Sequence, residues 1–328
     1  MKLMVRKLGR SGISISALGM GCWAIGGPFW RGNNSIGWGK IDDQESVRAV
    51  HKALDLGITY FDTADVYGAG HSERVLGEAL AGRRSEVVIS TKFGLTFNEE
   101  TRQAGEQDGS VEYVRVACQA SLRRLNTDYI DLYFLHIGDL DPDRAVSLRD
   151  ALEEMVKRGL IRSYGWSTDL EDRARLFAEG KGCTAIQSQM NVIEDAPRIV
   201  AVCERFNLAQ VVRGPLAMGL LTGKYRSGSS IPSDDVRGDK GPSWMKYFRG
   251  GKPAEEWLKK VEAVREILTS KGRTQAQGAL AWLWARSPNT IPIPGFKTAD
   301  QVAENASAMK HGPLTAEQLA EIDRILER

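Results

Sequence analysis

The chain has 328 residues, and its 44 basic and 42 acidic side chains leave a formal net charge of +2. This balance gives no global basic field, and no run of five or more like charges occurs, so we expect no nucleic-acid partner. No apolar stretch is long enough for a secretory signal or a membrane span. We therefore expect a cytoplasmic enzyme without a membrane partner, in an oligomeric state that the sequence leaves open.

The cysteines also exclude some classes of protein. Cys22, Cys118, Cys183 and Cys203 are widely scattered and form no CxxC pair. This spacing favours reduced thiols over a disulfide framework or a zinc site, and we expect no metal site.

Strand and helix patterns alternate along the chain after an opening hairpin whose turn is Gly9-Arg10-Ser11-Gly12. The expected strands are Val5–Leu8, Ile13–Ile15, Ile15–Gly21, Ile58–Phe61, Glu86–Thr91, Ile130–Leu135, Ile161–Trp166, Ala185–Gln189, Gln210–Arg213 and Thr290–Ile293. The expected helices are Gln44–Leu56, Ser72–Ala81, Ser110–Leu125, Arg144–Arg158, Glu171–Glu179, Pro197–Phe206, a helix-rich stretch Ala254–Ala285, Thr298–Ala308 and Thr315–Leu326.

Eight strands that are each followed by a helix predict an α/β fold of the (β/α)8 TIM-barrel type. The hairpin would precede this barrel, and extra helices would follow it at the C-terminus. Because no linker divides the chain, we expect one domain over residues 1–328. Two long, Gly-rich and aromatic stretches, Gly26–Gly39 and Arg226–Gly251, lie outside the alternation, and such loops tend to be lids or binding loops.

Four polar residues close, or just follow, three consecutive predicted strands: Asp62, Tyr67, Lys92 and His136. Because the carboxyl ends of parallel strands share one face, we expect these side chains to converge there. A lysine ammonium near a tyrosine favours the phenolate and so lowers a phenol pKa that starts at about 10. This set therefore suits proton delivery to a carbonyl oxygen.

These residues belong to motifs that resemble the aldo-keto reductase superfamily along nearly the whole chain. The motifs are Phe61-Asp62-Thr63-Ala64-Asp65-Val66-Tyr67-Gly68, Gly70-His71-Ser72-Glu73, Thr91-Lys92, Asp131-Leu132-Tyr133-Phe134-Leu135-His136, Gly165-Trp166-Ser167, Gly219-Leu220-Leu221-Thr222-Gly223-Lys224, and Pro294-Gly295 with Glu304-Asn305. The phrases Gly165–Asp169 and Pro294–Thr298 resemble bacterial members of the branch that includes potassium-channel β-subunits.

The resemblance implies a (β/α)8 barrel and a catalytic tetrad of Asp62, Tyr67, Lys92 and His136. Tyr67 would be the general acid, Lys92 would lower its pKa, and Asp62 would keep Lys92 charged. His136 would orient the substrate carbonyl. The implied reaction is the NADPH-dependent reduction of an aldehyde or ketone to an alcohol, with a small-molecule carbonyl compound as the partner.

No GxGxxG follows a strand, so nothing in the sequence indicates a Rossmann nucleotide site. The resemblance implies instead that NADPH lies extended across the barrel top. Ser167 and Gln187 match residues that hold the nicotinamide, whereas Thr168 stands where the family has Asn and Arg213 where it often has an aromatic ring. The implied cofactor residues are Gly21, Cys22, Trp23, Asp62, Ser167, Thr168, Gln187, Arg213, Gly214, Pro215, Leu216, Gly219, Leu220, Gly223, Lys224, Gly295, Lys297, Gln301, Glu304 and Asn305.

At the adenosine end, Gly295 would open the last helix of the barrel, whose N-terminal N–H groups suit an anion. Lys297 would meet the 2′-phosphate and favour NADPH. Trp23, Trp30 and Phe93 are candidates for the walls of the substrate pocket.

Two other functions stay open at this stage. One is an NADPH-binding regulatory subunit with little turnover, like the channel β-subunits. The other is a metal-dependent barrel hydrolase, which would also use Asp, Lys and His at strand ends but for which the sequence has no HxH motif.

Overall fold

The computed structural model describes residues 4–328 and contains one sheet of eight parallel strands, in the order β16-β13-β12-β11-β10-β7-β6-β3. These strands are β3 (Met20–Gly21), β6 (Tyr60–Asp62), β7 (Val88–Phe93), β10 (Ile130–Leu135), β11 (Ile161–Ser167), β12 (Cys183–Gln189), β13 (Ala209–Arg213) and β16 (Thr290–Pro292).

The sheet closes on itself through backbone contacts between its two edges. Gly19 N–H donates to the Pro292 carbonyl and Gly21 N–H to the Pro294 carbonyl, both at 3.0 Å. Gly21 also forms a parallel bridge with Gly295. These contacts complete the (β/α)8 barrel that the sequence predicts.

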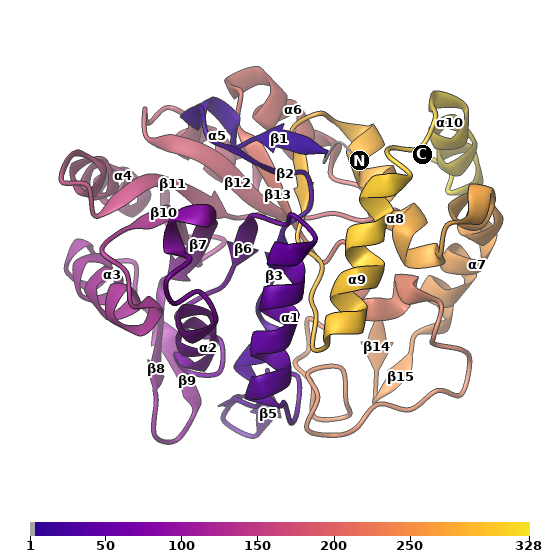
Figure 1. Ribbon diagram of the computed structural model, residues 1–328, viewed down its shortest axis with the longest axis horizontal. Helices are drawn as coiled ribbons and strands as arrows, with labels where there is room; N and C mark the ends of the chain where they lie inside the picture. Colours follow the sequence, from indigo (N-terminus) through magenta and orange to yellow (C-terminus); the bar gives the residue numbers. More distant parts are fainter. Residues whose placement is uncertain (1–3) are drawn as a thin grey trace.

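Ten α-helices surround this barrel in the described part of the chain (Figure 1). They are α1 (Asp43–Asp55), α2 (His71–Ala79), α3 (Val111–Leu125), α4 (Pro142–Lys157), α5 (Glu171–Ala178), α6 (Pro197–Phe206), α7 (Glu255–Thr269), α8 (Gln275–Arg286), α9 (Ala299–Ser307) and α10 (Ala316–Ile325). Short 3₁₀ turns are η1 (Gly9–Ser11), η2 (Ala24–Gly26), η3 (Arg84–Glu86), η4 (Ala217–Thr222), η5 (Ser270–Gly272) and η6 (Ala308–Lys310).

Side-chain caps explain where several helices begin. The Asp42 carboxylate accepts the N–H groups of Gln44 and Glu45 at the start of α1. Thr274 and Thr315 form capping boxes at the starts of α8 and α10. These oxygens satisfy N–H groups that have no partner inside the helix, which stabilises each start by roughly 1 kcal/mol.

The opening hairpin and the extra strands lie at opposite ends of the barrel in Figure 1. β1 (Val5–Lys7) pairs antiparallel with β2 (Ser14–Ser16) at one end, as predicted. The predicted strand Ile15–Gly21 is divided between β2 and β3, because Ser16 turns the chain: its N–H donates to the Thr59 hydroxyl, and its own hydroxyl donates to the Leu18 carbonyl.

The other end carries small sheets that the sequence pattern does not predict. One has the order β5 (Asn34–Ser35), β4 (Trp30–Arg31), β9 (Gln103–Gln107), β8 (Leu95–Asn98), and the other pairs β14 (Phe248–Arg249) with β15 (Lys252–Pro253). The two-residue strands β4, β5 and β14 lie within the two long loops and are too short for a period-2 pattern to predict.

The two long loops are bonded to each other. Val236 N–H donates to the Gly37 carbonyl at 2.6 Å, and the Ser35 hydroxyl donates to the Asp234 carbonyl at 2.7 Å. Together they lie at the carboxyl ends of the barrel strands.

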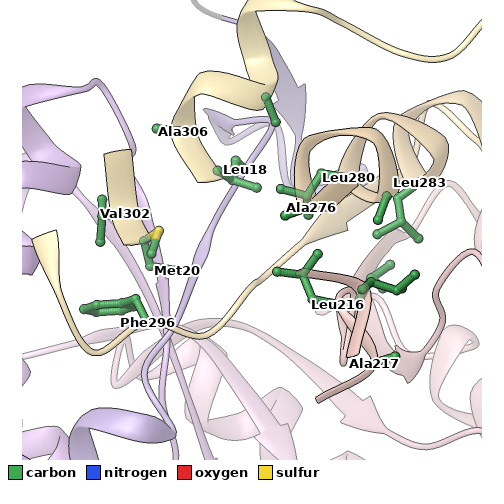
Figure 2. Packing of buried hydrophobic residues seen from close by; sticks show 14 of the residues in the cluster. Leu18, Met20, Leu216, Ala217, Ala276, Leu280, Leu283, Phe296, Val302 and Ala306 are labelled. Carbon is green, nitrogen blue, oxygen red and sulfur yellow. The ribbon is translucent and has the colours of Figure 1, made fainter. Parts of the chain in front are cut away.

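The largest apolar cluster lies between the barrel wall and α1, α2 and the helices α7 to α10. In Figure 2, Met20 and Phe296 face Val302 of α9, whereas Leu216 lies near Ala276 and Leu280 of α8. This packing holds α8 and α9 against the closing edge of the sheet. Among residues 4–328, none of the helices combines the length and apolar character that crossing a bilayer requires.

Barrel closure gives a test of stability at Gly21. A Cβ there would lie 2.7 Å from the Ile293 carbonyl oxygen, whereas a Cβ on Gly295, across the same bridge, would come no closer than 3.9 Å to Gly21 O. Gly21→Ala should therefore lower the free energy of unfolding by about 1–3 kcal/mol, measured by urea denaturation. Gly295→Ala is the matched control, and an equal loss in both variants would contradict the steric explanation.

Candidate active site

A buried ion pair lies where β6 and β7 end at the mouth of the barrel. Lys92 Nζ lies 2.6 Å from Asp62 Oδ2, and the ammonium also donates to the Thr63 carbonyl at 2.6 Å. The Lys92 side chain is 0% exposed and that of Asp62 only 3%. Such a pair is stable in a low-dielectric site because further hydrogen bonds satisfy both charges.

The second carboxylate oxygen of Asp62 extends the network across the mouth. Oδ1 accepts from the Ser90 hydroxyl at 2.7 Å and from Gln187 Nε2 at 2.8 Å. The Ser167 hydroxyl in turn donates to Gln187 Oε1 at 3.4 Å. The structure thus brings the predicted nicotinamide residues Ser167 and Gln187 into contact with the predicted catalytic carboxylate.

Sequence reasoning missed Ser90. Its position two residues before Lys92 in the same strand was the available signal, because residues i and i+2 of a strand point to the same face.

Tyr67 and His136 lie beside this ion pair. Lys92 Nζ lies 4.9 Å from the centroid of the Tyr67 ring. The His136 ring meets the Tyr67 ring edge-on, with centroids 5.9 Å apart and an interplanar angle of 84°. All four residues of the predicted tetrad therefore lie together at the carboxyl ends of β6, β7 and β10.

The protonation state of Tyr67 follows from two opposing effects. Burial raises the pKa of its phenol, and the positive charge of Lys92 lowers it, but burial is the larger effect and the pKa lies above its ordinary value. The expectation that Lys92 lowers this pKa is right about the direction of the lysine effect and wrong about the net shift. The neutral phenol is the form that can donate a proton.

Lys92 and His136 respond to burial in different ways. Burial acts to lower the pKa of Lys92, but the charge of Asp62 and the contact with Tyr67 raise it above its ordinary value. Burial, followed by the charges of Lys92 and Arg213, lowers the pKa of His136 well below its usual range. His136 is therefore a neutral imidazole, and within the described chain its Nδ1 has no hydrogen-bond partner.

The three predicted wall residues of the substrate pocket differ in placement. Trp23 lies against Tyr67, with ring centroids 5.8 Å apart and an interplanar angle of 24°. Trp30 is half-buried in β4, a strand that pairs with β9. Phe93 is 0% exposed and packs on Tyr133 of β10, so its predicted role as a pocket wall is contradicted by burial in the core.

Trp38 and Trp244 are aromatic neighbours that the sequence analysis did not assign to the pocket. Trp38 meets Trp23 edge-on at 5.4 Å, and Trp244 lies tilted against it at 6.2 Å. Both belong to the two long aromatic loops, and that location was the available signal.

At the predicted nicotinamide end, Thr168 and Arg213 are already engaged within the protein. The Thr168 hydroxyl donates to the Gly138 carbonyl at 2.6 Å and accepts from Leu170 N–H at 3.1 Å, so its one proton is engaged and only one lone pair remains to accept a hydrogen bond. The Arg213 guanidinium donates to Gln189 Oε1 at 3.1 Å and pairs with Asp169. These contacts hold the guanidinium at the rim of the mouth.

Two residues next to Trp23 offer little to a ligand. The Cys22 thiol is buried. The backbone N–H of Cys22 donates to the Asp62 carbonyl, and the Cys22 carbonyl accepts from the Ser72 hydroxyl. This placement argues against the predicted cofactor contact of Cys22. Gly21 forms backbone contacts that close the barrel.

The loop after β13, which is expected to cover the pyrophosphate, contains two glycines with positive φ. Gly219 and Gly223 have φ values of 94° and 78°, which glycine adopts at little cost. Leu216 and Leu220 are buried in the core, so only their backbone could face a cofactor. Gly214 and Pro215 continue β13 into this loop, and Lys224 is exposed beyond it.

At the adenosine end, the structure corrects the expected helix start. α9 begins at Ala299, whereas Gly295 belongs to the bridge that closes the barrel. The first N–H groups of α9 are occupied, because Ala299 N–H donates to the Glu45 carboxylate at 2.9 Å and Gln301 N–H to the Thr298 hydroxyl at 3.3 Å. These two N–H groups are therefore already engaged, and the anion site expected at this helix terminus stays a prediction.

The other predicted adenosine residues lie on or beside α9. The Gln301 side chain accepts from Lys297 N–H at 2.7 Å, and Asn305 is buried. The Glu304 carbonyl accepts from Gln277 at 3.3 Å, while its side chain is exposed.

The charges near Lys297 suit a phosphate. Its ammonium donates to the Trp38 carbonyl. Burial is the largest effect and lowers the pKa of Lys297, the carboxylates of Asp235 and Asp234 act to raise it, and the cations Arg237 and Lys224 act to lower it. Arg237 is already paired with Asp235, so Lys297 and Lys224 are the nearby cations that could meet a phosphate, and the residues present fit a phosphate-bearing dinucleotide. Among residues 4–328, no group of three or more His, Cys, Asp or Glu side chains is placed to hold a metal ion.

Comparison with known proteins gives a consistent result. The sequence profile of the Aldo/keto reductase family matches residues 17–327. The Schizosaccharomyces pombe aldo-keto reductase yakc, whose name carries NADP(+), is 31% identical over 321 residues, which is 94% of this chain and 88% of that protein.

Solved structures share the fold. The glycerol dehydrogenase AKR11B4 from Gluconobacter oxydans is 30% identical with a TM-score of 0.82, covering 99% of this chain and 95% of that one. An aldo-keto reductase from Klebsiella pneumoniae in complex with NADPH is 26% identical with a TM-score of 0.69, covering 99% and 96%. A place in the branch of the channel β-subunits stays a prediction. Because the family profile spans nearly all of its residues, this chain belongs to the aldo/keto reductase family.

Proposed function

We propose that the protein reduces aldehyde or ketone carbonyls to alcohols with NADPH, and that Tyr67 is the proton donor. The observation that carries the proposal is the proximity of the Tyr67 ring both to Lys92, which is paired with Asp62, and to the neutral His136 ring. A relative whose name carries NADP(+) and a solved relative in complex with NADPH support the choice of cofactor.

The proposed chemistry divides between cofactor and protein. NADPH, when bound, supplies the hydride. The Tyr67 hydroxyl donates its proton to the carbonyl oxygen as negative charge develops there. Lys92 stabilises the phenolate that remains, and Asp62 keeps Lys92 charged and in place. His136, which is neutral, is positioned to hydrogen-bond the carbonyl oxygen without bringing a positive charge that would compete with the proton donor.

The expected cofactor residues can each be assigned to one part of NADPH. Ser167 and Gln187 would hold the nicotinamide beside Asp62, and the Gly219–Lys224 segment would cover the pyrophosphate. Lys297 would bind the 2′-phosphate with its ammonium, and Gln301, Glu304 and Asn305 would surround the adenosine.

The role of Tyr67 is tested by Tyr67→Phe. Carbonyl reduction should fall by about 10²–10⁴-fold, because general acid catalysis contributes that much, while the Kd for NADPH changes little. Steady-state NADPH absorbance and cofactor fluorescence measure the two quantities. Tyr133→Phe is the matched control: this phenol is fully buried and packs on Phe93. Turnover of Tyr67→Phe near that of the control would rule out the proposed role.

The pH dependence of reduction follows from the two shifted pKa values. The raised pKa of Tyr67 keeps the phenol protonated through neutral pH, and the lowered pKa of His136 keeps the imidazole neutral. Reduction at saturating NADPH should therefore be nearly flat from about pH 6 to 9 and decline only in more alkaline solution, whereas alcohol oxidation, which needs phenolate, should rise with pH. A reduction rate that falls tenfold between pH 6 and 8 would be inconsistent with this assignment.

Cofactor preference is tested by Lys297→Met. A charge-assisted contact contributes roughly 1.5–3 kcal/mol, so the Kd for NADPH should rise about ten- to a hundredfold while that for NADH changes little. Lys157→Met, at a lysine on α4 that is 74% exposed, is the control. An equal loss of both cofactors would show that Lys297 acts mainly by holding the Trp38 carbonyl.

A further inference from the structure

Trp244 is a large apolar side chain that the protein leaves 56% exposed at the mouth of the barrel. The segment around it is anchored: Met245, Tyr247 and Phe248 are 6%, 3% and 2% exposed. Exposing an indole costs hydrophobic free energy that burial would recover. The neighbours of Trp244 show that its exposure is imposed by a packed segment and is not the result of a loose loop.

The anchor of this segment is the Tyr247 hydroxyl. It accepts from Gln189 Nε2 and from Asn191 Nδ2, each at 2.9 Å. Gln189 ends β12, so these bonds attach the loop directly to a strand end of the barrel. The position of Trp244 relative to the catalytic residues is thereby fixed by the barrel itself.

Trp244 continues an aromatic surface that begins at the proposed proton donor. Its ring lies 6.2 Å from that of Trp23 at an angle of 37°, and Trp23 lies nearly parallel to Tyr67. The Trp23 indole N–H donates to the Ile36 carbonyl at 3.2 Å, which fixes the orientation of the middle ring.

Trp38 forms a second side of this surface. It meets Trp23 at an interplanar angle of 87°, and the Arg237 guanidinium lies 4.6 Å above its ring. Arg237 is itself paired with Asp235 at 2.8 Å. Trp38 is therefore held between a neutralised cation and Trp23, at a right angle to the Trp23 ring.

We propose that Trp244 is a specificity-determining residue that selects carbonyl compounds carrying a flat apolar group, such as aromatic aldehydes. A planar substituent can bury the exposed face of Trp244 and stack on aromatic rings, whose offset or edge-on contacts add to the free energy of simple burial. The wall itself consists of indole rings, so it gives little binding to a small or strongly hydrated aldehyde. This proposal rests on the reductase function above.

The test compares benzaldehyde with propanal at saturating NADPH in Trp244→Ala. The KM for benzaldehyde should rise about 5- to 50-fold, because a hydrophobic contact in a pocket contributes on that order, while the KM for propanal changes less than about twofold. The kcat for both should be unaltered, because Trp244 does not contact Tyr67. Trp244→Phe, which keeps a ring, should restore most of the loss.

Two controls distinguish the loss of the Trp244 ring from a general loss of apolar surface and from a displaced loop. Val116→Ala removes an exposed apolar side chain on α3, 65% exposed, and should change neither KM. The Kd for NADPH should be the same in Trp244→Ala and the wild type if the loop keeps its place. Equal changes in KM for both aldehydes, or no change for either, would overturn the proposal.

Failure of the reductase function would give a different result. If the wild type turns over neither aldehyde, benzyl alcohol binding to the protein with NADP⁺ is measured by tryptophan fluorescence. If Trp244→Ala weakens this binding, the aromatic surface is retained and only the reductase function is rejected. If the variant leaves the binding unchanged, or if the wild type does not bind benzyl alcohol, the aromatic surface is rejected as well.

Discussion

The buried pair of Lys92 and Asp62 is the interaction on which the arrangement of the site depends. Two charges removed from water cost several kcal/mol each, and their attraction offsets this only when the remaining donors and acceptors are satisfied. Here Ser90, Gln187 and the Thr63 carbonyl supply those bonds. Because these groups come from β7, β12 and the end of β6, the pair requires strands from opposite parts of the barrel to meet.

That requirement explains why closure of the barrel matters to the chemistry. Gly21, at the closing edge, is followed by Cys22, whose N–H donates to the carbonyl of Asp62. The same edge carries Gly295 and leads to Lys297, whose ammonium reaches the Trp38 carbonyl in the first long loop. Backbone contacts where the two edges of the sheet meet therefore place the proposed catalytic carboxylate, the proposed phosphate ligand and part of the aromatic surface relative to one another.

Burial and charge together decide which groups can move a proton. Burial raises the pKa of Tyr67 and lowers that of His136, so each is held in its neutral form. Lys92 is buried as well, yet its contact with Asp62 keeps it charged. One positive charge thus lies next to a neutral phenol, an arrangement that stabilises the phenolate only once the proton has left.

The sequence by itself determined the alternation of strands and helices, the hairpin and the four polar residues at three strand ends, because periodicity, caps and strand-end position are local signals. Only the tertiary structure decided that Phe93 is core, that Gly295 closes the barrel instead of opening α9, and that the Gly138 carbonyl engages the Thr168 hydroxyl proton. It also brought Trp38 and Trp244 together on Trp23. Each of these depends on which distant segment lies opposite a residue, and neither propensity nor spacing along the chain encodes that.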